Sequence, residues 1–393
     1  MGKTTKTSLN MKQVSSILLV LILTGCSGAA PSADALITVD VTKKYPQKEL
    51  ILNDIMDVEY IALETTDEFV CQGEVRAIGK DVIVVMNQSN DGNIYIFDRN
   101  GKGLKKINRM GNSGEEYTYL SGITLDEDNN ELFVEDMERV LVYDLQGKFV
   151  RTFQKWWERG NLYRYNREHW IGKLATSNTD NKDANNSQFA IRSKQGENTV
   201  KDFSIHFEQK IETRIMVVRG DVSFGAGLAY SPLVPYRDSW ILADPSSDTL
   251  FRLSANYDFT PLVARTPSVQ SMDPAVFLFP KIFTERYYFM EAVKKEGDVE
   301  RRVGLFPKTH LVYDKQEGAM YEYTLHNDDF SVKKPVTLPR EVLNGEIALW
   351  HKYEALDLVD ALEKGELKGK LKDIAATLDE ESNPVIMLAK HKK

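Results

Sequence analysis

The chain has 393 residues and carries 50 Lys and Arg against 58 Asp and Glu, a formal net charge of −8. This acidic balance disfavours a nucleic-acid partner, because phosphate binding needs a basic face. The two cysteines, Cys26 and Cys71, leave no intrachain disulfide if the first is modified.

Residues 1–25 have the pattern of an export signal. A basic stretch with three lysines precedes the apolar run Val14–Leu23. About ten apolar residues are too few to span a ~30 Å hydrocarbon core, which needs about 20. They fit the apolar region of a secretory signal peptide, so residues 1–25 are predicted to be removed from the mature protein.

The signal ends in Leu23-Thr24-Gly25-Cys26, which resembles the lipobox of bacterial lipoproteins. The resemblance implies that Cys26 is acylated and becomes the mature N-terminus, so that the membrane is contacted through a lipid anchor. Residues 26–35 are small and polar and are predicted to form a flexible tether. Ser27 after the cysteine favours the outer membrane. The first acidic residue is as late as Asp34, which favours the periplasmic side over the cell surface.

From residue 36 onward, short runs of β-branched and aromatic residues alternate with Gly, Asn and Asp, which is typical of strands and turns. One hairpin pattern recurs, at residues 93–104, 139–150, 188–196, 249–259 and 320–330. The first steps, from Phe97 to Tyr143 and on to Ile191, match the roughly 40 to 50 residues of a propeller blade. The repeat therefore predicts an all-β propeller.

A sixth blade is predicted to combine both ends of the chain. Val58–Leu63 and a closing strand at about 384–390 both read as strands, and their pairing would close the ring. Between them, residues of about 353–378 have apolar side chains at helical spacing, with Gly365 and Gly369 dividing the segment. We expect a small C-terminal helical insertion there.

Three motifs carry a family resemblance. Gly111-x-x-Gly114-Glu-x-Tyr117, the Gly122-Ile-x-x-Asp126 step and the Val140–Gly147 hairpin resemble blades of NHL-type propellers. The whole layout is similar to the six-bladed β-propeller lipoproteins of Bacteroidetes. The resemblance implies one six-bladed β-propeller over residues 36–393, but no shared activity, because a fold does not determine a function.

No cofactor or metal site is predicted from the linear motifs. The six histidines show no metal-ligand spacing. Residues 126–130 are rich in oxygen ligands, yet they lack the Gly and Glu of a calcium loop and are interpreted as a turn. Calcium and zinc stay open, since propellers can gather ligands from several blades. Cys71 is interpreted as a buried small side chain.

An aromatic cluster is the main candidate for ligand binding. It comprises Trp156, Trp157, Tyr163, Tyr165 and Trp170, with Arg164 and His169 among them. Aromatic rings with cationic neighbours suit stacking on sugars or peptides. The alternative is ordinary packing between blades. The polar segment 178–187 nearby is either a rim facing a ligand or a solvated loop.

Two functions are compatible with these features. The first is a protein- or glycan-binding module or scaffold at the cell envelope. The second is a hydrolase or lyase acting on glycans or peptides at the central face, for which His169, Asp244 and Arg286 would have to converge.

Overall fold

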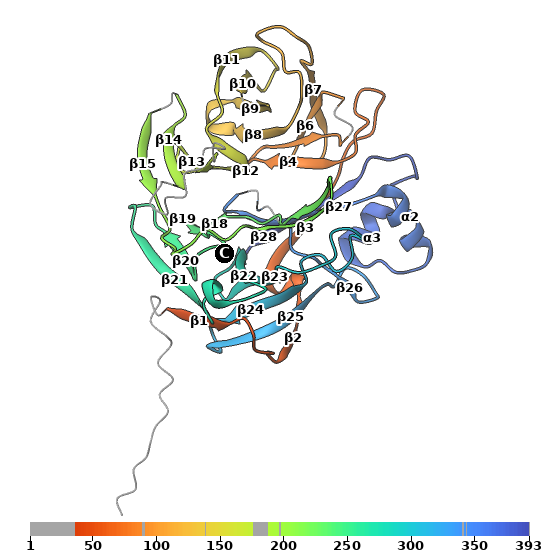
Figure 1. Ribbon diagram of the computed structural model, residues 1–393. Helices are drawn as coiled ribbons and strands as arrows, with labels where there is room; N and C mark the ends of the chain where they lie inside the picture. Colours follow the sequence, from red (N-terminus) through yellow and green to blue (C-terminus); the bar gives the residue numbers. More distant parts are fainter. Residues whose placement is uncertain are drawn as a thin grey trace, which may run out of the picture.

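The computed structural model describes residues 36–88, 91–137, 139–175, 188–195, 198–339, 342 and 344–392 (Figure 1). The predicted signal peptide, Cys26, the tether and the segment 178–187 lie outside the described residues. Within the described part of the chain, no helix is long and apolar enough to cross a membrane.

Six sheets stand around a central axis and form a six-bladed β-propeller, as the repeat predicted (Figure 1). In blades 1, 2 and 3 the strands follow one another in chain order, each antiparallel to the next. The first three blades are β4 (Glu74–Ile78), β5 (Val82–Met86), β6 (Asn93–Asp98) and β7 (Gly103–Asn108); β8 (Gly122–Asp126), β9 (Glu131–Asp136), β10 (Arg139–Asp144) and β11 (Phe149–Gln154); and β12 (Trp157–Arg164), β13 (His169–Leu174), β14 (Phe189–Ser193) and β15 (Thr199–Phe203).

The last three blades include strands from the N-terminal end of the chain. Blade 4 is β18 (Leu233–Tyr236), β19 (Ser239–Leu242), β20 (Thr249–Leu253), β21 (Phe259–Thr266) and β1 (Ile37–Asp40). Blade 5 is β22 (Val276–Phe283), β23 (Tyr287–Lys294), β24 (Lys308–Asp314), β25 (Ala319–Asn327) and β2 (Gln47–Ile51), with β26 (Lys334–Pro335) beside β25. Blade 6 is β27 (Ile347–Tyr353), β28 (Val385–His391) and β3 (Met56–Ala62).

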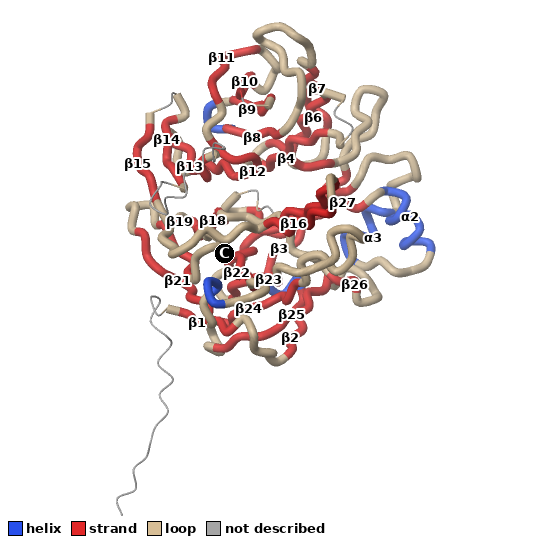
Figure 2. The backbone as a smooth tube through the Cα atoms, viewed as in Figure 1, coloured by secondary structure: helices blue, strands red, loops and turns tan. Residues whose placement is uncertain are grey.

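The short helices connect or extend these strands. They are α1 (Leu52–Ile55), the 3₁₀ turns η1 (Glu127–Asn129) and η2 (Val269–Ser271), and the pair α2 (Ala355–Glu363) and α3 (Gly369–Ala375). The pair α2 and α3 lies between β27 and β28 and packs at one side of the ring (Figure 2). Gly365 and Gly369, between and at the start of these helices, both have positive φ, which ends one helix before the other begins. The predicted helical insertion is therefore present.

In blades 1 and 2 the third strand ends in an aspartate, and this side chain forms the turn of the repeated hairpin. In blade 1, Oδ1 of Asp98 accepts the backbone N–H groups of Asn100 and Lys102, at 2.8 and 2.9 Å. Asp144 makes the same two contacts in blade 2. These two hydrogen bonds close the turn. The residue between the two donors, Gly101 in blade 1, has a positive φ, which glycine adopts without steric strain.

The fifth predicted hairpin is wrong, because the turn closed by an aspartate lies earlier in the chain. Residues 320–330 were expected to be a strand, turn and strand, but β25 runs through most of them as the fourth strand of blade 5. The equivalent turn follows Asp314, whose Oδ1 accepts the N–H of Gln316. One additional residue before Gly318 hides this turn from a pattern built on blades 1 and 2.

Residues 220–227 contain three glycines and lie between blades 3 and 4. They form the turn and second strand of a hairpin, β16 (Arg214–Arg219) and β17 (Val222–Gly227), inserted between blades 3 and 4. Met216 lies opposite Gly225, and its Sδ would come within 2.5 Å of a Cβ at that position. The glycine thus serves close packing rather than flexibility.

The N-terminal segment wraps around the outside of the ring. β1 is parallel to β21, and β2 is parallel to β25, so each adds a fifth strand at the outer edge of its blade. Lys48 of β2 contacts Asp314 at 2.7 Å, and Arg286 contacts the same carboxylate at 2.8 Å. Burial raises the pKa of Asp314, but these hydrogen bonds outweigh it and lower the pKa to about 2.

Both ends of the chain meet in blade 6, as the sequence predicted. β28 is antiparallel to β3, with Leu388 opposite Glu59, and also to β27. Asn383, just before β28, is buried and holds the segment that follows β3. Its Nδ2 donates to the carbonyls of Glu64 and Phe69 at 2.7 and 2.6 Å, and its Oδ1 accepts the N–H of Cys71 at 2.9 Å. Blade 6 therefore joins a strand from the N-terminal part of the chain to two from the C-terminal part, which closes the ring.

Candidate binding cavity

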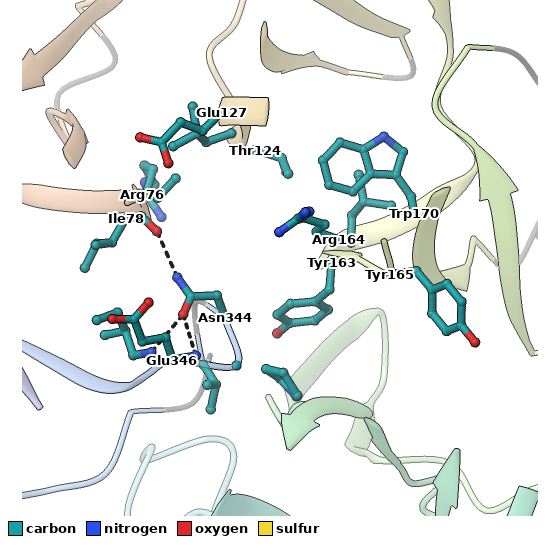
Figure 3. Close-up of a pocket in the computed structure, with 18 of the residues that line it drawn as sticks. Arg76, Ile78, Thr124, Glu127, Tyr163, Arg164, Tyr165, Trp170, Asn344 and Glu346 are labelled. Carbon is teal, nitrogen blue, oxygen red and sulfur yellow. Dashed lines mark hydrogen bonds between the residues drawn. The ribbon is translucent and has the colours of Figure 1, made fainter. Parts of the chain in front are cut away.

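The inner strands surround a cavity of about 1630 Å³. Its wall consists of β4, β8 and β12, completed by residues of blades 4 and 6. The turns after β4, β8, β12 and β18 line it as well, together with residues 344–346 before β27 (Figure 3). Because blades 1, 2, 3, 4 and 6 all supply lining residues, the cavity exists only in the assembled ring.

The lining is polar and carries both signs of charge. The basic residues are Arg76, Lys80, Arg164, Arg167 and Arg237, and the acidic residues are Asp81, Glu127, Asp128, Glu135, Asp238 and Glu346. Figure 3 shows Arg76, Glu127 and Asn344 around one open space, with the neighbouring residues Tyr163 and Arg164 of β12 on its other side. Such a surface offers donors, acceptors and rings together.

Several of these polar groups connect neighbouring blades. The Glu127 carboxylate accepts the backbone N–H groups of Asp81 and Val82 at 2.8 and 3.1 Å, which joins blade 2 to blade 1. Asn344 donates to the carbonyl of Ile78 at 2.8 Å, which joins blade 6 to blade 1 (Figure 3). The shape of this part of the wall is therefore set by hydrogen bonds, and these two side chains are already committed to them.

Other lining groups have a donor without a protein acceptor. Nε1 of Trp170, Nε1 of Trp240 and Nε of Arg76 are buried, and none has a hydrogen-bond partner among the described residues. A buried N–H without an acceptor costs roughly 1–3 kcal/mol.

The structure brings together only part of the predicted aromatic cluster. Tyr163, Arg164, Tyr165 and Trp170 line the cavity. Arg164 pairs with Asp128 of blade 2. Tyr165 stacks on Trp240 of blade 4, with ring centroids 4.6 Å apart.

Trp156, Trp157 and His169 are not among the lining residues. Trp157 is fully buried between blades 2 and 3, where its Nε1 donates to Glu135 at 3.0 Å. Trp156 packs edge-on against Trp157 and lies under the guanidinium of Arg192. These two rings therefore pack between strands, and truncating Trp157 would test the stability of the fold rather than binding.

His169 contacts the side chain of Asn166 within its own turn. The other two residues considered for catalysis lie elsewhere: Asp244 pairs with Lys210, and Arg286 pairs with Asp314. None of the three lines the cavity, so the structure does not bring them together there.

The possible metal and thiol sites have structural partners. Asp126 is buried and pairs with Lys194 of blade 3 at 2.8 Å, while residues 127–129 form η1, so this segment is a turn as interpreted. In the described part of the chain, no group of three or more His, Cys, Asp or Glu side chains is placed to hold a metal ion. Cys71 is buried, and burial raises the pKa of its thiol to about 11.

Several lining residues could not be found from the sequence. Arg76, Trp240, Asn344 and Glu346 come from three different blades and are isolated in the chain. One weak signal was available. Arg76 lies between the apolar residues Val75 and Ala77 in β4, where an arginine needs a polar surrounding.

The fold and cavity define a propeller with a ligand-sized central space, and the sequence places it in a family. Residues 30–339 match the model of a family described as 6-bladed beta-propeller, DUF5128. This is more than half of the chain, which therefore belongs to that family. The resemblance to Bacteroidetes-type six-bladed propellers is confirmed.

Solved structures share the architecture. The crystal structure of a protein described as exported, from Bacteroides fragilis, is 15% identical with a TM-score of 0.57, covering 91% of this chain and 100% of that one. A DUF4221 family member from Bacteroides vulgatus is 8% identical with a TM-score of 0.47, covering 86% and 98%. A search of curated proteins found no match. The first likeness supports the fold alone.

Proposed function

We propose that this protein is a lipid-anchored binding module of the cell envelope, which takes a protein or glycan ligand in its central cavity. The observation that carries the proposal is the cavity itself. It has about 1630 Å³ of space and aromatic and charged walls. A space of this size suits part of a larger ligand, such as a short oligosaccharide or a peptide segment.

Binding is favoured over catalysis by the state of the polar side chains. Glu127 and Asn344 form hydrogen bonds that connect neighbouring blades, and Arg164 forms an ion pair with Asp128. The residues considered for hydrolysis or lysis, His169, Asp244 and Arg286, have no place in the cavity wall. No observation favours an enzyme over a scaffold here.

The proposed location of the protein in the cell is supported by the N-terminal sequence and by one similar structure. The lipobox ending in Cys26 supports a lipid anchor, and the similar Bacteroides fragilis protein described as exported supports a location outside the cytoplasm. We place the protein at the outer membrane, on the periplasmic side.

The anchor is tested by labelling cells with a radioactive or clickable palmitate analogue. The wild-type chain is expected to take up the label and stay with the membrane fraction, whereas Cys26→Ser is expected to lose both properties. Protease added to intact cells should leave the wild-type chain uncut if it faces the periplasm. A label retained by Cys26→Ser would contradict the anchor assignment.

The binding role is tested by mild crosslinking and pull-down of the double variant Tyr163→Ala/Arg164→Ala. We expect it to lose most of the material captured by the wild type, because it removes a ring and a cation from one wall of the cavity. The control Tyr119→Ala/Arg301→Ala removes the same residue types from exposed positions outside the cavity. Because Tyr163 is buried, the thermal midpoints of both variants are measured, so that a loss of folding is distinguished from a loss of binding. Equal capture by both variants, or no capture by the wild type, would count against the proposal.

A further inference from the structure

Tyr257 has a positive φ, which is energetically unfavourable for a residue with a bulky side chain. It lies in the turn between β20 and β21 and has a φ of +67°. The corresponding position is Gly101 in blade 1 and Gly147 in blade 2, at +86° and +82°. In each case the residue comes three positions after the polar side chain that closes the turn, which is Ser254 in blade 4. A bulky residue there costs on the order of 1 kcal/mol or more.

The turn is held firmly in this conformation. The Ser254 hydroxyl accepts the N–H groups of Asn256 and Asp258 at 3.3 and 3.1 Å, as the aspartates do in blades 1 and 2. The Tyr165 hydroxyl donates to the carbonyl of Ala255 at 2.8 Å. The neighbouring blade therefore fixes the turn, and the ring of Tyr257 is presented in one orientation.

Tyr257 ends a stack of three aromatic rings. Its ring is nearly parallel to that of Tyr165, with an interplanar angle of 7° and centroids 5.7 Å apart. Tyr165 in turn stacks on Trp240. Tyr165 and Trp240 line the cavity, and so does Ala255 beside Tyr257. The stack thus extends from the cavity wall to the surface, where Tyr257 is 38% exposed.

The surroundings of the exposed ring are polar. Asn256 and Asp258 flank it in the same turn, and Asn166 and Arg167 follow Tyr165 in the turn of blade 3; all four are exposed. At the inner end of the stack, the buried Nε1 of Trp240 has no acceptor among the described residues.

We propose that the Trp240–Tyr165–Tyr257 stack is a sugar-binding subsite, so that the ligand of the cavity is a glycan. This rests on the function proposed above and names its ligand class. One pyranose ring stacks its C–H face on the exposed face of Tyr257, and its hydroxyls meet the amide, carboxylate and guanidinium groups beside it. The chain then continues along the wall into the cavity. Stacking of a sugar on the Tyr257 ring explains why a tyrosine stands at a position where blades 1 and 2 have glycine.

The test uses Tyr257→Gly, which restores the residue found in blades 1 and 2. Removing the strained side chain relieves the backbone, so the thermal midpoint is expected to stay within a few degrees of the wild type. Tyr257→Asn, which also tolerates positive φ, is the second variant if the first is poorly folded. Tyr257→Phe keeps the ring and is expected to bind as the wild type does. Tyr119→Ala is the control for losing an exposed tyrosine elsewhere.

The probes are tetrasaccharides of glucose, mannose, xylose, galacturonic acid and N-acetylglucosamine, titrated calorimetrically against the purified chain. We expect at least one to bind, with an affinity roughly tenfold lower in Tyr257→Gly and Tyr257→Asn. Unchanged affinity in both folded variants would overturn the subsite. If no tetrasaccharide binds while pull-down still captures a protein that the Tyr163/Arg164 variant loses, the glycan inference fails and the binding function stands. If neither probe nor partner binds, both proposals fail.

Discussion

Lys194→Met is expected to lower the free energy of unfolding by about 3–5 kcal/mol, because it leaves Asp126 buried without its counter-charge. The Lys194 ammonium lies 2.8 Å from the Asp126 carboxylate, and their side chains are only 1% and 0% exposed. The two residues come from blades 3 and 2, so the pair lies where these blades meet. Burial lowers the pKa of Lys194, and the hydrogen bond from Lys194 to Asp126 opposes that change.

The measurement is urea unfolding of the purified chain, followed by tryptophan fluorescence. This signal reports on the same region, since the Lys194 ammonium also lies 4.4 Å from the centre of the Trp170 ring. The double variant Lys194→Met/Asp126→Asn removes both charges and is expected to recover much of the loss. Lys333→Met is the control, because the Lys333–Glu49 pair is exposed and such pairs contribute at most about 1 kcal/mol. A loss as small as that of the control would refute the role given to the buried pair.

Asn383→Ala is expected to cost about 3 kcal/mol and to loosen the closure of the ring. The substitution removes two donated hydrogen bonds and one accepted hydrogen bond. It leaves the N–H of the buried Cys71 without its partner, at a cost of roughly 1–3 kcal/mol. The carbonyls of the exposed Glu64 and of Phe69, which still accepts the N–H of Thr66, lose one donor each and add a smaller cost. The stability loss should be measurable by denaturant unfolding.

Hydrogen exchange distinguishes loosened closure from general destabilisation. In Asn383→Ala the amides of β3 and β28 should exchange faster than those of β9 and β10, which lie in a blade formed by consecutive strands. Asn112→Ala, at an exposed asparagine, should change stability by less than about 0.5 kcal/mol. Equal acceleration of exchange in all blades would mean that Asn383 has no special part in closure.

The fold was predictable because its main signals are local. Asp98 and Asp144 close their turns by accepting backbone N–H groups two and four residues later, and a glycine occupies the position with positive φ. A short sequence pattern is therefore enough to predict the hairpin. The same logic failed for blade 5, where one inserted residue separates Asp314 from Gly318. The parallel strands β1 and β2 left no local signal, because their partners lie far along the chain.

The cavity was predictable only where neighbours in sequence are neighbours in the wall. Tyr163, Arg164 and Tyr165 belong to one strand and its turn, so a compositional cluster located them. The same cluster included Trp157, because burial between blades and exposure to a ligand favour the same residue type. Trp240 and Glu346 join the wall only through closure of the ring, which a linear pattern does not contain.

The wrapping of the N-terminal segment has a consequence for the order of folding. β1 needs β21, β2 needs β25 and β3 needs β28, so the first strands synthesised wait for partners in the last ones. Contacts this distant in sequence form late, since the loop between them must close first. The blades in the middle can assemble from consecutive strands, but the ring cannot lock before the C-terminus is available. The ring is therefore expected to stay open during synthesis until β28 has been made and can pair with β3.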